Sequence, residues 1–195
     1  YRSENFSRLQ AQYQFERGDL QPAIVILIEL YKTAPNYQNA LLLAQFLSDA
    51  GQYQDAIRYA SAAFQLQPQP ASVMLLTKLY WRTEQPFVAL DLFKQYLTQF
   101  PEHISVRLLF ANMLQQLQRF EQAKTQFKLM LQQDPEHVFA LVNLTKIYIR
   151  QQQVSNASPL IQKALQLAPD APEILDLHGW VLGLQQQYEQ ALTYL

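Results

Sequence analysis

Five prolines recur along the chain at nearly constant intervals. They are separated by 33, 33, 34 and 34 residues, and a small residue lies twelve positions before each of them. The series of small residues continues for one interval beyond the last proline. The prolines and the small residues therefore follow the same repeat interval. Such a pattern predicts an internal repeat of 33 or 34 residues. The prolines are Pro35, Pro68, Pro101, Pro135 and Pro169, and the small residues are Ala23, Ala56, Ala89, Ala123, Ala157 and Ala191.

Each repeat divides into two helical patterns of about a dozen residues. In the second repeat, Leu43, Ala44 and Leu47 share one helical face, and Gly51 suits the left-handed residue that closes a helix. The second pattern ends before Pro68, which cannot continue a helix. Small residues allow two antiparallel helices to approach closely. One helical hairpin cannot bury its apolar face alone, so we expect the hairpins to stack on one another.

The repeat resembles the tetratricopeptide repeat. The second repeat matches the pattern of that family at Leu43, Ala44, Gly51, Tyr53, Ala56, Ala63 and Pro68. The resemblance implies an all-α fold, a right-handed α-solenoid superhelix of antiparallel helix pairs, with about five and a half repeats. We expect a single solenoid domain over residues 1–195, cut from a longer chain because it opens at Tyr1. The expected repeats are residues 4–36, 37–69, 70–103, 104–137, 138–171 and, in part, 172–195.

Local departures from the family pattern occur in the first, third and fifth repeats. The first repeat has Gln10 and Gln14 where large apolar residues are usual. Glu84 and Pro86 occupy the turn of the third repeat, where glycine and an aromatic residue are usual. Pro159 lies inside the second helical pattern of the fifth repeat, and we expect that helix to start late, near Ser158. His178 falls at a bulky core position of the sixth repeat, which predicts a packed histidine.

Composition and motifs argue against several kinds of function. The net charge is −1 and the pI is about 6.3, so the chain has no basic field for nucleic acid. Its longest apolar stretch, Ala23–Ile28, is far shorter than a membrane span. The sequence has no glycine-rich phosphate loop, zinc-protease motif or nucleophile elbow. We therefore expect no catalytic residue, cofactor or metal site, and the repeated His103 and His137 are interpreted as junction-loop residues.

The resemblance implies that the first helix of each repeat lines a concave groove for a partner. Basic, amide, apolar and aromatic residues alternate along these helices, and such residues are common at binding hot spots. We expect a protein or peptide partner that is apolar with some acidic character. Asn5, Arg8 and Gln12 hold groove positions in the first repeat. The predicted partner-binding residues are Gln45, Met74, Lys78, Trp81, Arg82, Leu108, Asn112, Lys146, Ile149 and Arg150.

The sequence leaves more than one role open. The leading hypothesis is a non-enzymatic scaffold for protein–protein interaction. One alternative is a docking or regulatory domain of a larger enzyme or of an envelope export apparatus for exopolysaccharide or pili. The stretch from Leu175 to Leu192 resembles the terminal repeats of bacterial envelope proteins of this family, which favours the periplasm or cell envelope. A third role is self-assembly into a homo-oligomer through uncapped solenoid ends.

Overall fold

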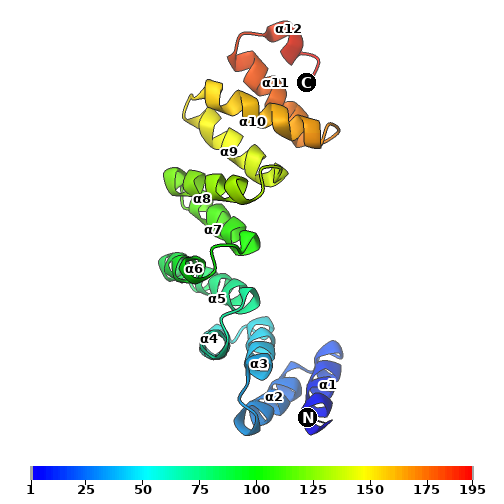
Figure 1. Ribbon diagram of the computed structural model, residues 1–195. Coiled ribbons are helices and arrows are strands. Elements are labelled where there is room, and N and C mark those ends of the chain that lie inside the picture. The colour runs from blue at the N-terminus through cyan, green and yellow to red at the C-terminus, as the bar shows by residue number, and fades with distance from the viewer. Residues whose placement is uncertain (1, 195) are drawn as a thin grey trace. The chain divides into compact units, whose positions relative to one another are not determined.

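The computed structural model describes residues 2–194, and within that range it contains twelve α-helices and no strand (Figure 1). The predicted all-α class is thereby confirmed. The first helices of the repeats are α1 (Arg2–Glu16), α3 (Tyr37–Asp49), α5 (Pro70–Arg82), α7 (Ile104–Gln116), α9 (Val138–Arg150) and α11 (Pro172–Leu184). The second helices are α2 (Leu20–Thr33), α4 (Tyr53–Leu66), α6 (Pro86–Gln99), α8 (Phe120–Gln133), α10 (Val154–Leu167) and the short α12 (Tyr188–Ala191).

The chain divides into two compact units, with the division between Val106 and Arg107 in α7. In the first unit, α1 packs on α2, α3 on α4 and α5 on α6, while α2 also contacts α3 and α4 contacts α5. In the second unit, α8, α9, α10, α11 and α12 contact one another in chain order. Arg107 links α7 to α8, because its Nη1 donates a hydrogen bond of 2.8 Å to Oε1 of Gln126. Each unit is therefore a stack of sequential helical hairpins.

One turn geometry joins the two helices of every hairpin. A residue with φ between 58° and 86° follows the first helix, and the next residue donates its backbone N–H to a carbonyl five residues earlier. Gln52 reaches Leu47 over 2.8 Å in this way, and Gln85 reaches Tyr80 over 2.7 Å. This pattern is the Schellman closure of a helix. The left-handed residues are Gly18, Gly51, Glu84, Gln118, Gln152 and Gln186.

The third repeat keeps this turn despite its unusual residues. Glu84 adopts φ 58° where the two preceding repeats have glycine. Pro86 is the first residue of α6, where a missing N–H costs no intrahelical bond. The departure from the family pattern therefore changes the residue types of the turn and leaves its hydrogen bonds in place.

The small-residue series lies at the centre of the hairpins. Ala23, Ala56, Ala89, Ala123 and Ala157 are completely buried, and Ala191 is 5% exposed. Equivalent positions of the first helices also hold small buried residues, such as Ala11, Ala44 and Ala111. These alanines permit the close approach of the paired helices that the sequence predicted.

The late start expected for the second helix of the fifth repeat is wrong. Helix α10 begins at Val154 and continues through Pro159. Proline removes a single backbone donor, so one hydrogen bond to the carbonyl of Ser155 is lost near the beginning of the helix. Ala157 and Ile161, on either side of Pro159, are completely buried. Their packing holds this turn of the helix across the proline.

Gly51 and Gly183 form a matched pair that tests the left-handed turn. A Cβ at either position would meet no atom within 4 Å, but only Gly51 has a positive φ. We expect Gly51→Ala to lower the free energy of unfolding by about 1 kcal/mol. Gly183→Ala lies within a helix and is expected to raise it by about 0.5–1 kcal/mol. Urea denaturation measures both changes, and equal effects would contradict the role of the turn.

His178 occupies the core position that the sequence predicted. Its side chain is 7% exposed and packs edge-on against Tyr194, with ring centroids 4.6 Å apart. Its Nδ1 makes no hydrogen bond within residues 2–194. Burial lowers the pKa of His178 below its ordinary value of 6.5, because the charged form would lose its hydration.

This histidine should make folding sensitive to acid. The unfolded chain takes up the proton near pH 6.5, while the folded chain resists it until a lower pH. The free energy of unfolding contributed by this group is therefore fully present above pH 6.5 and falls as the pH drops through the folded pKa. We expect His178→Leu to reduce the fall in thermal midpoint between about pH 7.5 and about pH 5.5. An unchanged fall in the variant would contradict the assignment.

Candidate functional site

One cavity of the first unit is lined by the first helices of three successive repeats. Its volume is about 760 Å³, and α1, α3 and α5 supply all of its side chains. Three of the predicted partner-binding residues, Gln45, Met74 and Lys78, lie in this first-helix cavity. The other lining residues are Gln12, Phe15, Glu16, Leu42, Phe46, Ser48, Asp49, Ala71 and Leu75.

The register of the repeat explains how these side chains come together. Gln12, Gln45 and Lys78 are 33 residues apart, so each occupies the same position on its own helix. All three are exposed, and Met74 keeps 43% of its surface accessible. The cavity thus combines an exposed thioether with two amides and one ammonium group. Amides can donate to and accept from a peptide backbone.

Two carboxylates in the cavity were missed by the sequence analysis. Glu16 and Asp49 are the last residues of α1 and α3, and both are exposed. They share a register position with Arg82, which ends α5 and was predicted to bind the partner. The repeat register could have identified Glu16 and Asp49, because it places them and Arg82 at the same end of successive first helices. This end of the first helices changes from acidic to basic along the first unit.

The two arginines of the predicted set already contact aromatic rings of the preceding repeat. The guanidinium of Arg82 lies 5.9 Å from the ring centroid of Tyr53, and its Nη1 donates to the Tyr53 hydroxyl over 3.3 Å. The guanidinium of Arg150 lies 4.3 Å from the ring centroid of Phe120. In each case an arginine at the end of a first helix covers the start of a second helix. These contacts are cation–π interactions between neighbouring repeats.

The remaining predicted residues show varied exposure. Trp81 in α5 is 40% exposed. In the second unit, Leu108 and Asn112 of α7 and Ile149 of α9 are half-buried. Lys146 is exposed and forms an ion pair with Glu173 of α11. Partner binding by these residues stays a prediction.

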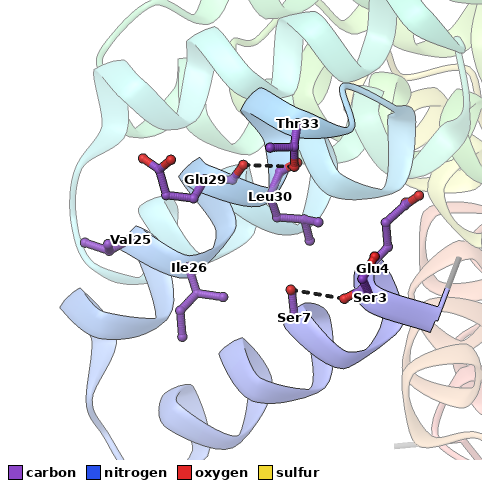
Figure 2. A pocket seen from close by; sticks show the side chains of 8 residues that line it. All are labelled: Ser3, Glu4, Ser7, Val25, Ile26, Glu29, Leu30 and Thr33. Atoms are coloured by element: carbon purple, nitrogen blue, oxygen red, sulfur yellow. Dashed lines mark hydrogen bonds between the residues drawn. The ribbon is translucent and has the colours of Figure 1, made fainter.

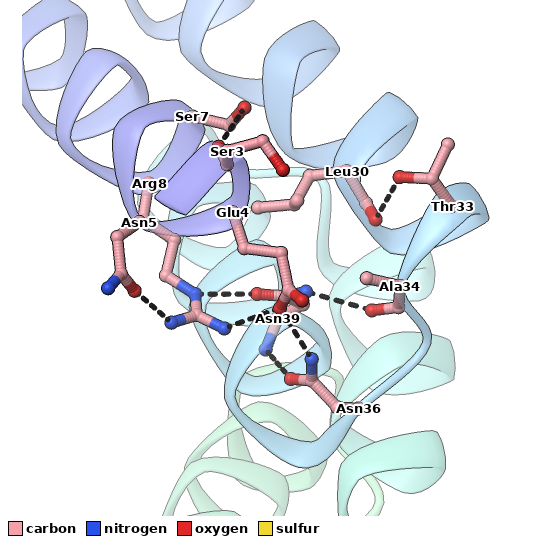
Figure 3. Close-up of polar contacts among 10 residues, drawn as sticks. All are labelled: Ser3, Glu4, Asn5, Ser7, Arg8, Leu30, Thr33, Ala34, Asn36 and Asn39. Atoms are coloured by element: carbon pink, nitrogen blue, oxygen red, sulfur yellow. Dashed lines mark hydrogen bonds and ion pairs between the residues drawn. The ribbon is translucent and has the colours of Figure 1, made fainter. Parts of the chain in front are cut away.

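Two groove positions of the first repeat, Asn5 and Arg8, belong to a polar network (Figure 3). Arg8 donates from Nε to Oδ1 of Asn39 over 2.7 Å and from its two other nitrogens to Asn5 and Glu4. Asn39 is completely buried and donates from Nδ2 to the carbonyl of Ala34 over 2.8 Å. Asn39 therefore ties α1 to the beginning of α3, and Arg8 is engaged by protein groups.

Removing the Asn39 amide tests whether this network is structural. We expect Asn39→Ala to lower the free energy of unfolding by about 1–3 kcal/mol, since buried polar partners lose their hydrogen bonds. Asn5→Ala removes an exposed amide from the same network and is expected to change it by less than about 0.5 kcal/mol. Chemical denaturation of the two variants provides the comparison. Equal losses of unfolding free energy in the two variants would contradict a structural role for the buried Asn39 amide.

A second cavity of about 420 Å³ lies between α1 and α2 (Figure 2). Two of its hydroxyl groups, those of Ser7 and Thr33, are used within their own helices. Ser7 donates to the carbonyl of Ser3, and Thr33 donates to the carbonyls of Glu29 and Leu30. This cavity offers fewer free polar groups for fixing a ligand than the first-helix cavity does.

A metal centre and a membrane span each require features that the described part of the chain does not show. Residues 2–194 contain no group of three or more His, Cys, Asp or Glu residues placed to hold a metal ion. Over the same range, every helix falls short of the length and apolar character that a membrane crossing requires. Within the first unit, the first-helix cavity brings amide, ammonium, carboxylate and apolar side chains together.

Sequential helical hairpins pack on one another within each unit, and this arrangement places the chain in the class of helical repeat proteins. Family models described as "Tetratricopeptide repeat" match residues 14–79 and 140–175. A third model, "Anaphase-promoting complex, cyclosome, subunit 3", matches residues 49–129. The chain belongs to the tetratricopeptide repeat family.

The similar curated proteins are much longer than this chain. Tetratricopeptide repeat protein 8 of Mus musculus is 31% identical over 91 residues, which cover 47% of this chain and 18% of the mouse protein. The Caenorhabditis elegans protein of the same name is 23% identical over 151 residues, which cover 77% of this chain and 30% of that protein. The chain thus spans less than a third of these relatives.

Solved structures share the fold at low sequence identity. A tetratricopeptide repeat protein from Parabacteroides merdae has a TM-score of 0.72 at 16% identity, covering 100% of this chain and 78% of the other. MamA has a TM-score of 0.67 at 16% identity, with 84% and 91% covered. YrrB, described as having an unusual peptide-binding site, has a TM-score of 0.64 at 18% identity, with 87% and 88% covered. These similarities confirm the α-solenoid class.

Proposed function

We propose that the chain is a non-enzymatic scaffold that binds a segment of a partner protein in the first-helix cavity. The observation that carries this proposal is the alignment of Gln12, Gln45 and Lys78 along one cavity of about 760 Å³. Tetratricopeptide repeats generally serve as scaffolds for protein–protein interaction. The peptide-binding site named for YrrB, a protein of similar fold, supports the same kind of role here.

The chemistry of the cavity suggests the character of the partner. Leu42, Met74 and Leu75 offer apolar contact, and the two glutamine amides can bond the backbone of an extended segment. The ammonium group of Lys78 is exposed and would pair with a carboxylate. The expected partner is therefore an apolar segment with an acidic residue opposite Lys78.

The proposal extends to the equivalent surfaces of other first helices. Trp81 and Arg82 continue α5 beyond the cavity, and the second unit offers its own set on α7 and α9. We include the positions of that set among the partner-binding residues because they hold the same register as the cavity residues. They are Leu108, Asn112, Lys146, Ile149 and Arg150.

A displayed peptide library selected against the chain tests the first-helix cavity. Lys78→Glu should weaken the selected peptides by about fivefold to tenfold, because attraction to a carboxylate becomes repulsion. Met74→Ala should weaken them by about fivefold through lost apolar contact. Isothermal titration calorimetry measures these changes in Kd.

Two variants outside the cavity serve as matched controls. Lys94→Glu reverses an exposed lysine on α6, and Val25→Ala shortens an apolar side chain on α2 that is 57% exposed. Both are expected to leave the Kd of the selected peptides within about twofold. If Lys78→Glu and Met74→Ala change the Kd of the selected peptides no more than these controls do, the proposed site is contradicted. A selection that yields no binder would also count against it.

A further inference from the structure

A pair of matching cavities lies between second helices and shares no residue with the first-helix cavity. One is in the first unit, between α4 and α6 beside α5, with a volume of about 350 Å³. The other is in the second unit, between α8 and α10 beside α9, with a volume of about 370 Å³. Phe64, Leu76, Tyr80 and Leu92 of the first correspond in register to Leu131, Leu144, Tyr148 and Leu160 of the second.

The boundary between the first and second repeats shows which group occupies this place. Tyr31 and Tyr59 hold the register positions of Leu131 and Leu160 there. Their rings meet edge to face, with centroids 5.4 Å apart and an interplanar angle of 86°. Both rings are replaced by leucine at the boundary between the fourth and fifth repeats. The equivalent place at the first boundary thus accommodates aromatic rings, so the apolar walls at the later boundary suit an aromatic ring.

A lysine that makes no ion-pair contact within residues 2–194 lies at the same cavity, although its charge adds to the hydrogen bond from Lys124 in lowering the pKa of Glu121. Lys128 lines it, is exposed, and has its Nζ 5.8 Å from the ring centroid of Tyr148. Its equivalent in the third repeat, Lys94, pairs with Asp91 over 3.0 Å. Thr125 replaces that aspartate in the fourth repeat. Within the described residues, no carboxylate lies within ion-pairing distance of Lys128, whereas its neighbour Lys124 pairs with Glu121 over 2.7 Å.

We propose that the cavity between α8 and α10 is a second docking site, which takes an aromatic side chain flanked by a carboxylate. The ring would lie against Leu131, Tyr148 and Leu160, where the first repeats place their own tyrosines. The carboxylate would pair with the ammonium group of Lys128, which supplies the charge complementarity. The partner is thus a protein segment with an aromatic residue next to an acidic one. This site shares α9 with the proposed scaffold surface but has no residue in common with it.

Phenylacetate is the simplest probe that joins a ring to a carboxylate. Titrated into methyl-labelled protein and followed by NMR, it is expected to bind with a Kd of about 1–10 mM and to shift the methyl signals of Leu131, Leu144 and Leu160. Acetate, which lacks the ring, and phenylacetamide, which lacks the charge, are expected to bind at least about twofold more weakly. Equal shifts from all three compounds, or shifts confined to other methyl groups, would overturn the proposal.

Two variants separate the ring from the charge. Leu160→Tyr restores the ring found at Tyr59 and is expected to abolish phenylacetate binding by filling the cavity. Lys128→Gln is expected to weaken binding by about twofold to fivefold, whereas Lys94→Gln, its register equivalent, leaves the Kd unchanged. Leu131→Tyr, which restores the ring found at Tyr31, provides a second filling variant should Leu160→Tyr fail to fold, as checked by circular dichroism. Binding that survives a folded filling variant would refute the site.

The same variants distinguish this inference from the proposed function. Met74→Ala lies in the first-helix cavity and should leave phenylacetate binding unchanged. Leu160→Tyr should leave the affinity of the library-selected peptides unchanged. A loss of phenylacetate binding in Met74→Ala would show that the probe occupies the first-helix cavity, and would overturn the second site.

Discussion

The whole architecture depends on how closely the two helices of each hairpin approach. The completely buried alanines at Ala23, Ala56, Ala89, Ala123 and Ala157 make that approach possible. A bulkier residue there would separate the helices, and overpacking of such positions costs about 1–3 kcal/mol. Once the hairpins are closed, their apolar faces are covered by the next hairpin in the chain. The regular placement of first helices, and with it the first-helix cavity, follows from this contact.

The turn that closes each hairpin is held by its backbone. The same pair of backbone hydrogen bonds forms whether the left-handed residue is glycine, glutamate or glutamine. Side chains at the turn therefore vary without changing the path of the chain. The third repeat illustrates this, because Glu84 and Pro86 depart from the family pattern while the turn persists.

The sequence predicted the repeat and the class of fold, because these depend on period and residue size. The register of the repeat also placed Gln12, Gln45, Met74 and Lys78 on the first-helix face that lines the cavity. Prediction from the sequence failed at Pro159, since the helix is held by burial of Ala157 and Ile161 that local propensity does not reveal. It also missed Glu16 and Asp49, whose place in the cavity depends on how three helices align. Likewise, a list of charged residues could not show that Arg8 is engaged by the buried amide of Asn39.

The contacts of Arg82 with Tyr53 and of Arg150 with Phe120 have a mechanical consequence. Attraction between a cation and a ring face varies gently with position, so small sliding motions cost little compared with breaking a directional hydrogen bond. Each such contact connects the first helix of one repeat to the second helix of the repeat before it. The ring contact of Arg150 therefore restrains sliding between its two repeats less than the contact of Arg82 does, because Arg82 also donates a hydrogen bond to Tyr53.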